Sequence, residues 1–287
     1  MKKWLIRILL FVLVLVILAA AYAYYQMRSR GFWRLPSYET EPPAIPQLDG
    51  KPSVLVFSKT GAFIHKEAIP AAEAMFRKLA DEHGWSLFVT ENGAVHNPQD
   101  LAKFDVIVWN NSTGDLLNPQ QQQALMDYLD NGGGWVGIHG AGDSSSTWQW
   151  QNEELIGAHF IGHPMKPQFQ QARVVIEAPD DPVMKHLGSE WYRTDEWYSY
   201  AQSPRKSGKT ILATLDESTY SPLFFGEDIS MGEDHPIVWK QCVGSGRALY
   251  SAMGHTAESF SEQKHVEMLE QAILWAADRQ NGGCPED

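Results

Sequence analysis

Residues 132–143, Gly-Gly-Gly-Trp-Val-Gly-Ile-His-Gly-Ala-Gly-Asp, constrain the fold more than any other part of the sequence. The first glycines are typical of a helix end, the apolar centre predicts a short buried strand, and the glycines around His139 favour a sharp turn. Such a junction lies at the carboxyl edge of an α/β sheet, where these folds place their chemistry. In nucleophile elbows of this pattern the turn residue is Ser or Cys, so His139 indicates a different chemistry.

Strands and helices alternate around this run. Residues 72–79 repeat apolar side chains at helical spacing, and Asn118-Pro119 is a typical start for a helix that ends at the glycines of 132–134. The alternation predicts an α/β fold with a mostly parallel sheet. Strands are expected at 53–58, 85–90, 105–110, 135–138, 173–177, 210–214, 236–240 and 247–252, and a closing amphipathic helix at 261–279.

The amino terminus differs in composition from the rest of the chain. Residues 1–30 contain five Lys or Arg and no acid, and residues 8–25 are 18 uncharged, mostly apolar residues. Because a helix of roughly 20 apolar residues crosses a bilayer, we expect an uncleaved membrane anchor. The alternative is a cleaved signal peptide, since Ala21-Tyr22-Ala23 resembles a cleavage site, although the apolar run exceeds the roughly 7 to 15 residues usual there.

Basic residues flank both ends of the apolar run, so the positive-inside rule favours a cytoplasmic amino terminus only weakly. That orientation makes the chain a single-pass inner-membrane protein with a periplasmic domain; cleavage would make it a secreted protein. Residues 31–52 contain five prolines and predict a semi-rigid spacer. The expected organisation is therefore an anchor at 1–30, a linker at 31–52, a domain at 53–280 and a polar tail at 281–287.

Charge and cysteine content narrow the classes of partner. The chain has a formal net charge of −12, so the part beyond residue 30 carries −17. Nucleic acids and anionic lipid surfaces are bound by patches of Lys and Arg, so neither is expected to bind this domain. Cys242 and Cys284 are the only cysteines, and the sequence leaves open whether they pair. The oligomeric state stays open as well.

Histidines in turn-like settings supply a candidate site. His65, His139 and His255 each follow a predicted strand, so all three are expected at one edge of the sheet. His163, between a Gly and a Pro, has a similar setting. Imidazoles with one carboxylate suit Zn²⁺, Mn²⁺ or Fe²⁺, or serve as general acid and base. The remaining histidines are interpreted as structural: His83, His96, His159, His186, His235 and His265.

The segment 191–200 combines carboxylates with aromatic side chains. Asp195 and Glu196 are adjacent, and Trp197 and Tyr198 follow them. Aromatic rings beside carboxylates suit sugar binding, because apolar sugar faces stack on rings while hydroxyls hydrogen-bond to charges; they suit a plain core equally. If the segment is extended, the two carboxylates point to opposite faces and only one enters the crevice.

Seven stretches recur together in one known family: 54–61 leading to His65, 111–115, 132–139, 162–164, 194–198, 234–239 and 254–259. On these stretches the chain resembles the ThuA-like (trehalose utilisation) family from about residue 54 to 275. The resemblance implies a three-layer flavodoxin-like fold of the class I glutamine amidotransferase type, and a link to disaccharide breakdown through keto sugars, sometimes with a divalent metal. His139 stands where the amidotransferases carry Cys, so glutamine hydrolysis is not expected.

The resulting hypothesis is a membrane-anchored enzyme of carbohydrate metabolism that performs metal-assisted hydrolysis or isomerisation of an oxidised sugar. The alternatives are a non-catalytic carbohydrate-binding module and a scaffold at the membrane, of which the scaffold predicts that the histidines do not converge. The expected catalytic residues are His139, Glu196 and His65; the metal ligands are His65, His139, His163, His255 and Glu196; the substrate-binding residues are Asp195, Trp197, Tyr198 and Asp115.

Overall fold

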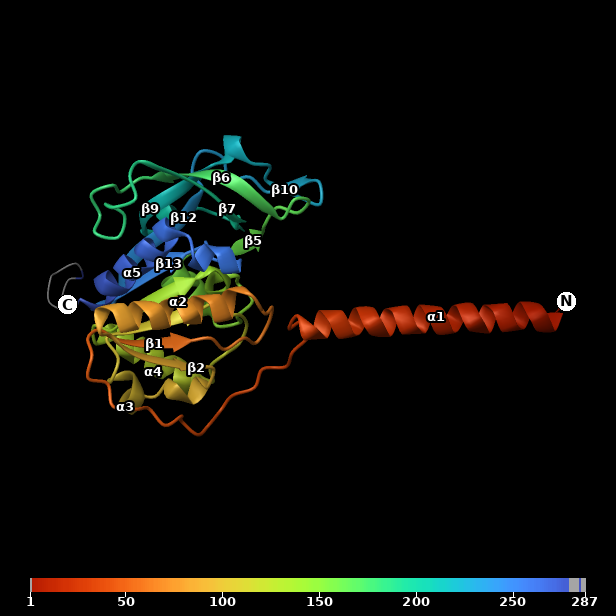
Figure 1. Cartoon of the computed structure of the whole chain (residues 1–287), viewed down its shortest axis with the longest axis horizontal. Helices are drawn as coiled ribbons and strands as arrows, with labels where there is room; N and C mark the ends of the chain where they lie inside the picture. Colours follow the sequence, from red (N-terminus) through yellow and green to blue (C-terminus); the bar gives the residue numbers. More distant parts are fainter. Residues whose placement is uncertain (1, 279–283, 285–287) are drawn as a thin grey trace.

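The computed structural model describes residues 2–278 and residue 284, and places one long helix outside an α/β domain (Figure 1). The helix is α1 (Lys2–Ser29), and none of its apolar window is buried in the protein. Its 28 residues span about 42 Å, which fits a membrane span or a signal sequence, as the sequence predicts. Apart from Cys284, the predicted tail 281–287 lies outside the described residues.

A nine-stranded sheet forms the centre of the domain, in the order β2-β1-β3-β4-β13-β12-β9-β6-β7. All the predicted strands occur, shifted by a few residues at most, and β7 is added to them. The strands are β1 (Ser53–Phe57), β2 (Ser86–Thr90), β3 (Val106–Asn110), β4 (Gly134–Ile138), β6 (Phe169–Ile176), β7 (Glu190–Glu196), β9 (Thr210–Asp216), β12 (Pro236–Val243) and β13 (Gly246–Ser251).

The expectation of a mostly parallel sheet is correct for only one half. Neighbouring strands are parallel from β2 to β13, which we call the parallel half, and antiparallel through β12, β9, β6 and β7, the antiparallel half. Parallel neighbours need a long crossover, usually a helix. Residues 169–251, all of which the structure describes, contain only short helical turns, so these strands pair antiparallel.

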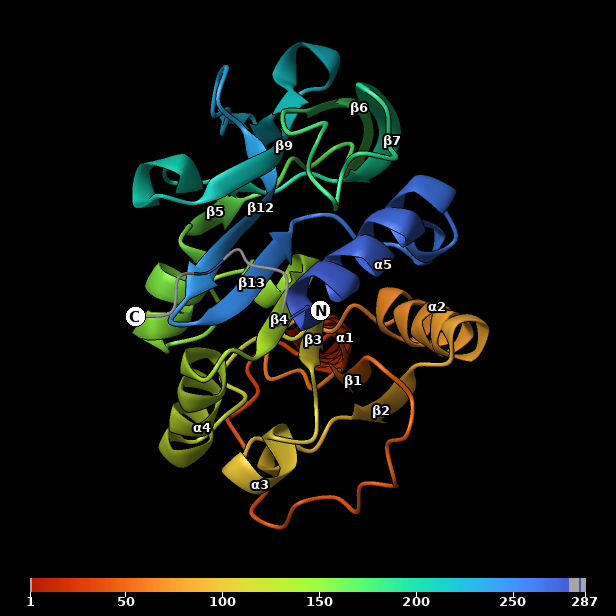
Figure 2. The same ribbon diagram turned by 90° about the vertical axis from the view of Figure 1, so that its left-hand side faces the viewer.

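Helices cover both faces of the parallel half, which gives it three layers (Figure 2). In Figure 2, α2 and α5 lie on one side of β1, β3 and β4, and α3 and α4 lie on the other. Strands covered on both faces are mostly apolar, and β1, β3, β4 and β13 are buried at every residue. The helices are α2 (Ala68–His83), α3 (Pro98–Leu101), α4 (Pro119–Asp130) and α5 (Gln263–Ala277).

Smaller elements complete the domain. Two short ladders pair β5 (Phe160–Gly162) with β8 (Ser199–Tyr200), and β10 (Leu223–Phe224) with β11 (Glu227–Asp228). Short helical turns lie at Gly93–Val95, His139–Gly142, Gln151–Ile156, Pro204–Ser207, Glu217–Thr219 and Ala257–Phe260.

The proline-rich linker is not the free spacer that its composition predicts. It runs along the domain (Figure 1), and its Ile45 and Leu48 pack against the core. The Glu39 carboxylate pairs with Lys59 (2.6 Å) and accepts the backbone N–H of Gly93 (2.8 Å). Prolines keep the backbone extended, and an extended strap bonds to a surface along its length without a fold of its own. The linker is therefore packed on the domain.

A disulfide joins Cys242 on β12 to Cys284, with 5.4 Å between the Cα atoms. The pairing that the sequence left open is thus present. It ties the carboxyl-terminal part of the chain to the antiparallel half.

Candidate functional site

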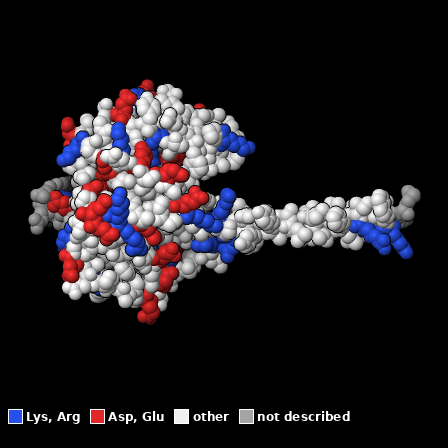
Figure 3. Space-filling model, in the orientation of Figure 1, with Lys and Arg blue, Asp and Glu red and all other residues white. Residues whose placement is uncertain are grey.

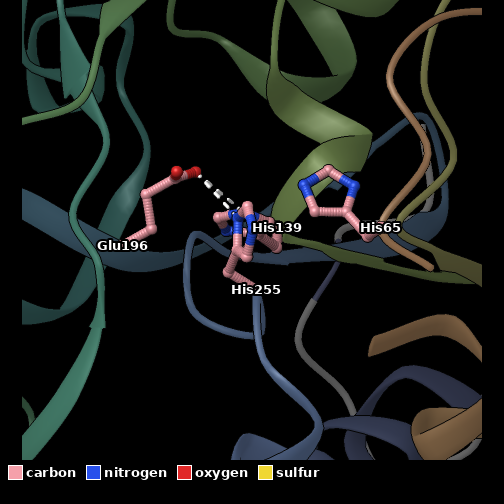
Figure 4. A group of neighbouring side chains, drawn as sticks. All are labelled: His65, His139, Glu196 and His255. Atoms are coloured by element: carbon pink, nitrogen blue, oxygen red, sulfur yellow. Dashed lines mark hydrogen bonds and ion pairs between the residues drawn. The ribbon is translucent and has the colours of Figure 1, made fainter. Parts of the chain in front are cut away.

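Three histidines and one glutamate converge at the carboxyl edge of the parallel half (Figure 4). His65 follows β1, His139 follows β4, His255 follows β13, and Glu196 is the last residue of β7. One ligand atom from each lies within 4.8 Å of the other three, and we call these residues the histidine–glutamate cluster. The scaffold alternative predicted that the histidines stay apart, which the cluster contradicts.

His139 occupies the sharp turn that the glycine-rich run predicts. Its φ is +44°, a left-handed conformation that residues other than Gly rarely adopt, and a short helical turn starts here directly after β4. A Cβ at Gly140 would lie 2.9 Å from Cε1 of His65, so the glycine lets the two histidines approach. The fold therefore holds a strained residue at the point where it presents the His139 side chain to the cluster.

A backbone carbonyl fixes the orientation of His139. Its Nδ1 lies 2.7 Å from the Ala252 oxygen, so Nδ1 carries a proton and donates it, and Nε2 faces the cluster. The Tyr198 ring packs on the imidazole with the centroids 4.2 Å apart, and the Tyr250 hydroxyl donates to the His139 carbonyl oxygen (2.7 Å). A histidine oriented through its second nitrogen in this way is typical of metal ligands.

Three ligand atoms form a tight triangle. Nε2 of His139 lies 3.1 Å from Nδ1 of His255 and 3.3 Å from Oε2 of Glu196, and Nδ1 of His255 lies 3.0 Å from the same oxygen. Tetrahedral bonds of about 2.0–2.1 Å place ligand atoms about 3.3–3.4 Å apart, so the triangle is close to what Zn²⁺ requires. Imidazole and carboxylate ligands also suit Mn²⁺ and Fe²⁺.

His65 completes the cluster from the loop after β1. It is buried, and its ring centroid lies 4.8 Å from that of His139 and 4.7 Å from that of His255. Among the described residues, no group hydrogen-bonds to its Nδ1. A buried polar atom without a partner is costly, and a bound ion or water would satisfy it. The donor set and this unpartnered nitrogen both fit a divalent metal.

The electrostatics of the cluster favour a bound cation. Burial acts to raise the pKa of Glu196, but hydrogen bonds with His139 and His255 outweigh it and hold the pKa well below its usual value. Burial acts to lower the pKa of His139, but the neighbouring Glu196 carboxylate reverses this and raises the pKa. Burial and the neighbouring imidazoles place the pKa of His65 well below its usual value, so this ring is neutral at pH 7.

His163 was expected among the metal ligands, but it lies beside the cluster. Its Nδ1 is 3.2 Å from Oε1 of Glu196, the oxygen that does not belong to the triangle, and 3.1 Å from the carbonyl oxygen of Pro164. The Gln168 amide donates to the same Oε1. Because 22% of its side chain is exposed, His163 lies on the outer, solvent-accessible side of Glu196.

Asp195, expected to bind substrate, has a fully buried carboxylate that holds the loop of His255. Its oxygens accept the backbone N–H groups of Gly254 (2.9 Å) and His255 (3.1 Å), and pair with the guanidinium of Arg193 (2.8 Å). Because β7 is extended, only Glu196 of the two adjacent acids turns its carboxylate into the cluster, as the alternation of side chains predicts. Asp195 is therefore a positioning residue.

The structure places the other three expected substrate-binding residues in different surroundings. Trp197 is buried and its indole N–H donates to the Gln170 carbonyl (2.8 Å), which makes it a core residue. Asp115 accepts the backbone N–H of Thr147 (2.6 Å) and so holds a neighbouring loop. Tyr198 is buried as well, but its ring contacts His139. Of these three, Tyr198 alone touches a side chain of the cluster.

Two phenylalanines flank the cluster, and neither was among the expected site residues. The ring centroids of Phe169 and Phe63 lie 5.0 Å and 6.1 Å from that of His255, and Phe169 is 41% exposed. No local pattern marks Phe169 or Gln168, because both reach the site through the pairing of β6 with β7. Phe63 lies two residues before His65, and this spacing was its only available signal.

His235, interpreted as structural, supports the site through the backbone of Tyr198. It is fully buried; its Nδ1 lies 2.7 Å from a Glu217 carboxylate oxygen and its Nε2 lies 2.8 Å from the Tyr198 carbonyl oxygen. It therefore fixes the backbone of the residue that packs on His139.

Comparison with known proteins places the chain in a family. The ThuA family, described as trehalose utilisation, matches residues 53–276, and no curated protein matches the chain. A ThuA-like protein of Bacteroides uniformis is 26% identical, with a TM-score of 0.67 over 82% of this chain and 95% of that one. A ThuA-like protein of Parabacteroides merdae is 17% identical, with a TM-score of 0.59 over 79% and 90%. A cytoplasmic protein of Salmonella typhimurium LT2 is 12% identical, with a TM-score of 0.54 over 78% and 99%.

The family match covers most of the chain, and the solved ThuA-like proteins share its fold. Within that match, the histidines of three separate motifs meet in one cluster. The chain therefore belongs to the ThuA (trehalose utilisation) family.

Proposed function

We propose that this protein is a metal-dependent enzyme that acts on an oxidised (keto) sugar at the histidine–glutamate cluster. The observation that carries the proposal is the cluster itself, in which three imidazoles and one ionised carboxylate converge. Buried titratable groups at the carboxyl edge of a parallel sheet are typical of active sites. The description of the family as trehalose utilisation supports a carbohydrate as the substrate.

His139, His255, Glu196 and His65 would hold the metal. When bound there, a divalent ion supplies Lewis acidity toward a carbonyl or hydroxyl oxygen of the sugar. The protein orients its ligands before any substrate arrives: the Ala252 carbonyl holds the ring of His139, and Asp195 holds the backbone of His255. Such supporting contacts preserve ligand geometry.

His163 is placed to move a proton at the edge of this centre. It contacts Glu196 and is partly exposed, and burial lowers its pKa, so the neutral form that accepts a proton prevails at pH 7. Isomerisation or elimination beside a keto group needs such a base, and departure of a glycosidic oxygen needs its conjugate acid. Product analysis distinguishes these hydrolase, lyase and isomerase chemistries.

Phe169 and Phe63 provide apolar surfaces that suit a sugar ring. Both flank His255, the cluster histidine with the most exposed side chain. A pyranose presents one apolar C–H face that packs on an aromatic ring, while its hydroxyls remain free for polar groups. Substrate bound on Phe169 would therefore lie next to the metal ligands.

We also propose that α1 anchors the domain outside the cytoplasm. The helix is long and apolar enough to span a membrane. The disulfide between Cys242 and Cys284 supports an oxidising compartment, since structural disulfides are rare in the cytosol. The weak charge preference for a cytoplasmic amino terminus agrees with this orientation.

Metal binding and turnover test the proposed activity together. Full-length protein in detergent is stripped with a chelator, reloaded with Zn²⁺, Mn²⁺ or Fe²⁺, and incubated with a keto-disaccharide. We expect one tightly bound ion per chain and product only from a loaded form. His139→Ala should lose both properties, whereas His159→Ala, an exposed histidine outside the cluster, should keep both.

Two outcomes would contradict the proposal. Sugar binding by calorimetry without product from any loaded form would favour the carbohydrate-binding module. Unchanged turnover by a metal-free His139→Ala variant would remove both the metal and this histidine from the mechanism.

A further inference from the structure

The end of α1 is joined directly to the loop that carries His65. The Ile64 N–H donates to the Arg30 carbonyl oxygen (2.9 Å). Gly31 is buried at φ +95°, where a Cβ would collide with the carbonyl oxygen of Ala62. In Figure 1, β1 points toward α1, so the carboxyl edge of the sheet and the end of the helix share one side of the molecule. The candidate site is therefore on the side of the domain from which α1 extends.

Basic side chains gather on this side, although the domain as a whole is acidic. Arg28, Arg30 and Arg34 lie where α1 meets the domain, and Lys66 is exposed in the loop after β1. Figure 3 shows Lys and Arg around the base of α1 and a second group at the right-hand end of the upper part of the domain. The average charge argued against an anionic lipid surface, but it conceals this local excess of positive charge, which anionic headgroups attract.

The β10–β11 hairpin ends in an exposed aromatic side chain. Phe225 is 63% exposed with φ +49°, and Gly226 follows at φ +98°, so these two residues form the tight turn of the hairpin. Asn, Asp and Gly are preferred where both φ angles are positive, and Phe is strained there. Within this chain the strained ring gains little buried area. A contact outside the chain would explain why Phe occupies this position.

The surroundings of the tip suit a lipid interface. Leu223 is 42% exposed, and the Lys166 ammonium lies 5.8 Å from the centroid of the Phe225 ring. Aromatic rings flanked by lysines are typical of the boundary between headgroups and acyl chains. Glu227 and Asp228 follow on β11 and are exposed, so the attraction of the tip to a membrane would be apolar rather than electrostatic.

We propose that the β10–β11 hairpin is a second membrane contact, in which Phe225 enters the interface of the bilayer that α1 spans. The inference rests on the proposed anchoring by α1. Figure 1 shows the hairpin in the upper part of the domain, on the side from which α1 extends. The helix end is tied to the loop of His65, and Met165, two residues after His163, donates its N–H to the Leu223 carbonyl (2.9 Å). The loop of His65 is thus bonded to the end of α1, and the segment after His163 is bonded to the hairpin, so the buried histidine–glutamate cluster lies between the two proposed contacts.

Quenching by nitroxide-labelled lipids tests this contact in the full-length protein. The chain is reconstituted in liposomes of phosphatidylglycerol and phosphatidylcholine, which contain no other protein. A fluorophore is attached through Glu227→Cys beside the tip, Asn131→Cys at the opposite edge of the sheet, or Leu13→Cys within α1. We expect quenching at residue 227 to be at least twice that at residue 131, and Phe225→Ser to reduce it to the level of residue 131.

The other possible quenching results distinguish failure of the second contact from failure of the anchor. Strong quenching at residue 13 with equal, weak quenching at residues 227 and 131 would overturn the second contact and leave the anchor intact. No quenching at residue 13 would overturn the anchor and this inference with it. Quenching at residue 227 that Phe225→Ser leaves unchanged would contradict the assigned role of Phe225. A protein occupant of the tip predicts the absence of quenching in these liposomes, whose only other component is lipid.

Discussion

The two halves of the sheet contribute to the candidate site in different ways. The parallel half supplies three histidines, each in the segment that follows a strand: His65 after β1, His139 after β4 and His255 after β13. The antiparallel half supplies Glu196 at the end of β7, and the side chains of Gln168 and Phe169 beside it. The histidines follow from local strand-to-turn signals, whereas Glu196 reaches them only through strand pairing between distant segments.

This difference indicates a division of roles. The parallel half fixes the imidazoles, of which those of His65 and His139 are buried, and the antiparallel half adds the charge of Glu196 and the exposed ring of Phe169 next to them. Substitutions in the antiparallel half should therefore separate the charge of the cluster from the positioning of its residues, and a substitution on α5 tests the burial of the parallel half. Four substitutions test this division of roles, from the largest expected effect to the smallest.

Glu196→Gln should have the largest effect, because it removes the only carboxylate of the cluster. We expect affinity for Zn²⁺ and turnover to fall by more than about 100-fold, beyond the loss typical of a supporting residue. Calorimetry with the stripped protein measures the first quantity and product formation the second. Glu190→Gln, at the exposed start of the same strand, is the matched control. Unchanged affinity in Glu196→Gln would show that the parallel half binds metal alone.

Asp195→Ala should destabilise the domain, because it leaves the Arg193 guanidinium buried without its closest partner. Removing one member of a buried ion pair costs about 3–5 kcal/mol, and the lower end applies here since Glu262 remains 3.4 Å from Arg193. Urea unfolding measures the change in the free energy of unfolding. Asp228→Ala, an exposed acid, should stay within about 0.5 kcal/mol of the parent. A similarly small effect of Asp195→Ala would refute its positioning role.

His265, on the α5 helix that covers the parallel half, should make the domain acid-sensitive. Burial lowers its pKa to about 3, so below pH 6.5 the unfolded chain binds a proton that the folded chain does not. Stability is therefore lost as pH falls from about 6.5 toward 3, at up to about 1.4 kcal/mol per pH unit for this residue. Urea unfolding between pH 7 and pH 4 should show a smaller slope in His265→Gln, whereas His159→Gln, an exposed histidine, should match the parent.

Gln168→Ala should have the smallest effect of the four, because it removes one hydrogen bond to Glu196 and leaves every ligand of the cluster in place. We expect a loss of about 10-fold in metal affinity, the lower end of the range for supporting residues. The same calorimetric titration measures it, with Gln171→Ala, an exposed glutamine three residues further along the chain in β6, as the control. A loss as large as that of Glu196→Gln would mean that Gln168 itself contacts the metal.

Several parts of the fold were predictable because their signals are local. The helix α4 starts where Asn118-Pro119 predicted, with Asn118 and Gln121 forming a capping box. The strand β4 and the turn at His139 follow directly from the glycine-rich run. β7 was harder to recognise, because Asp195 and Glu196 are buried although their charge is typical of exposed positions.

The proline-rich linker also shows that local sequence signals do not reveal contacts with distant residues. Its prolines indicate a segment without helix, and residues 34–52 form neither helix nor strand in the structure. Composition carries no information on whether Glu39 finds Lys59, because that pairing depends on the surface against which the strap lies. An extended segment with bonding partners is packed, and one without them is a spacer.

By itself, the sequence determined that the candidate site lies at the carboxyl edge of the sheet and that three histidines follow strands there. It also determined the apolar character of α1 and the family. Only the tertiary structure decided that Glu196 joins the cluster, that Asp195 holds the loop of His255, and that His163 lies beside the cluster. Turns, caps and buried strands follow from preferences that act over a few neighbouring residues. Membership of the cluster depends on separations of 3.0–3.3 Å between atoms of His139, Glu196 and His255, which follow β4, end β7 and follow β13, and strand pairing across the whole domain sets these separations.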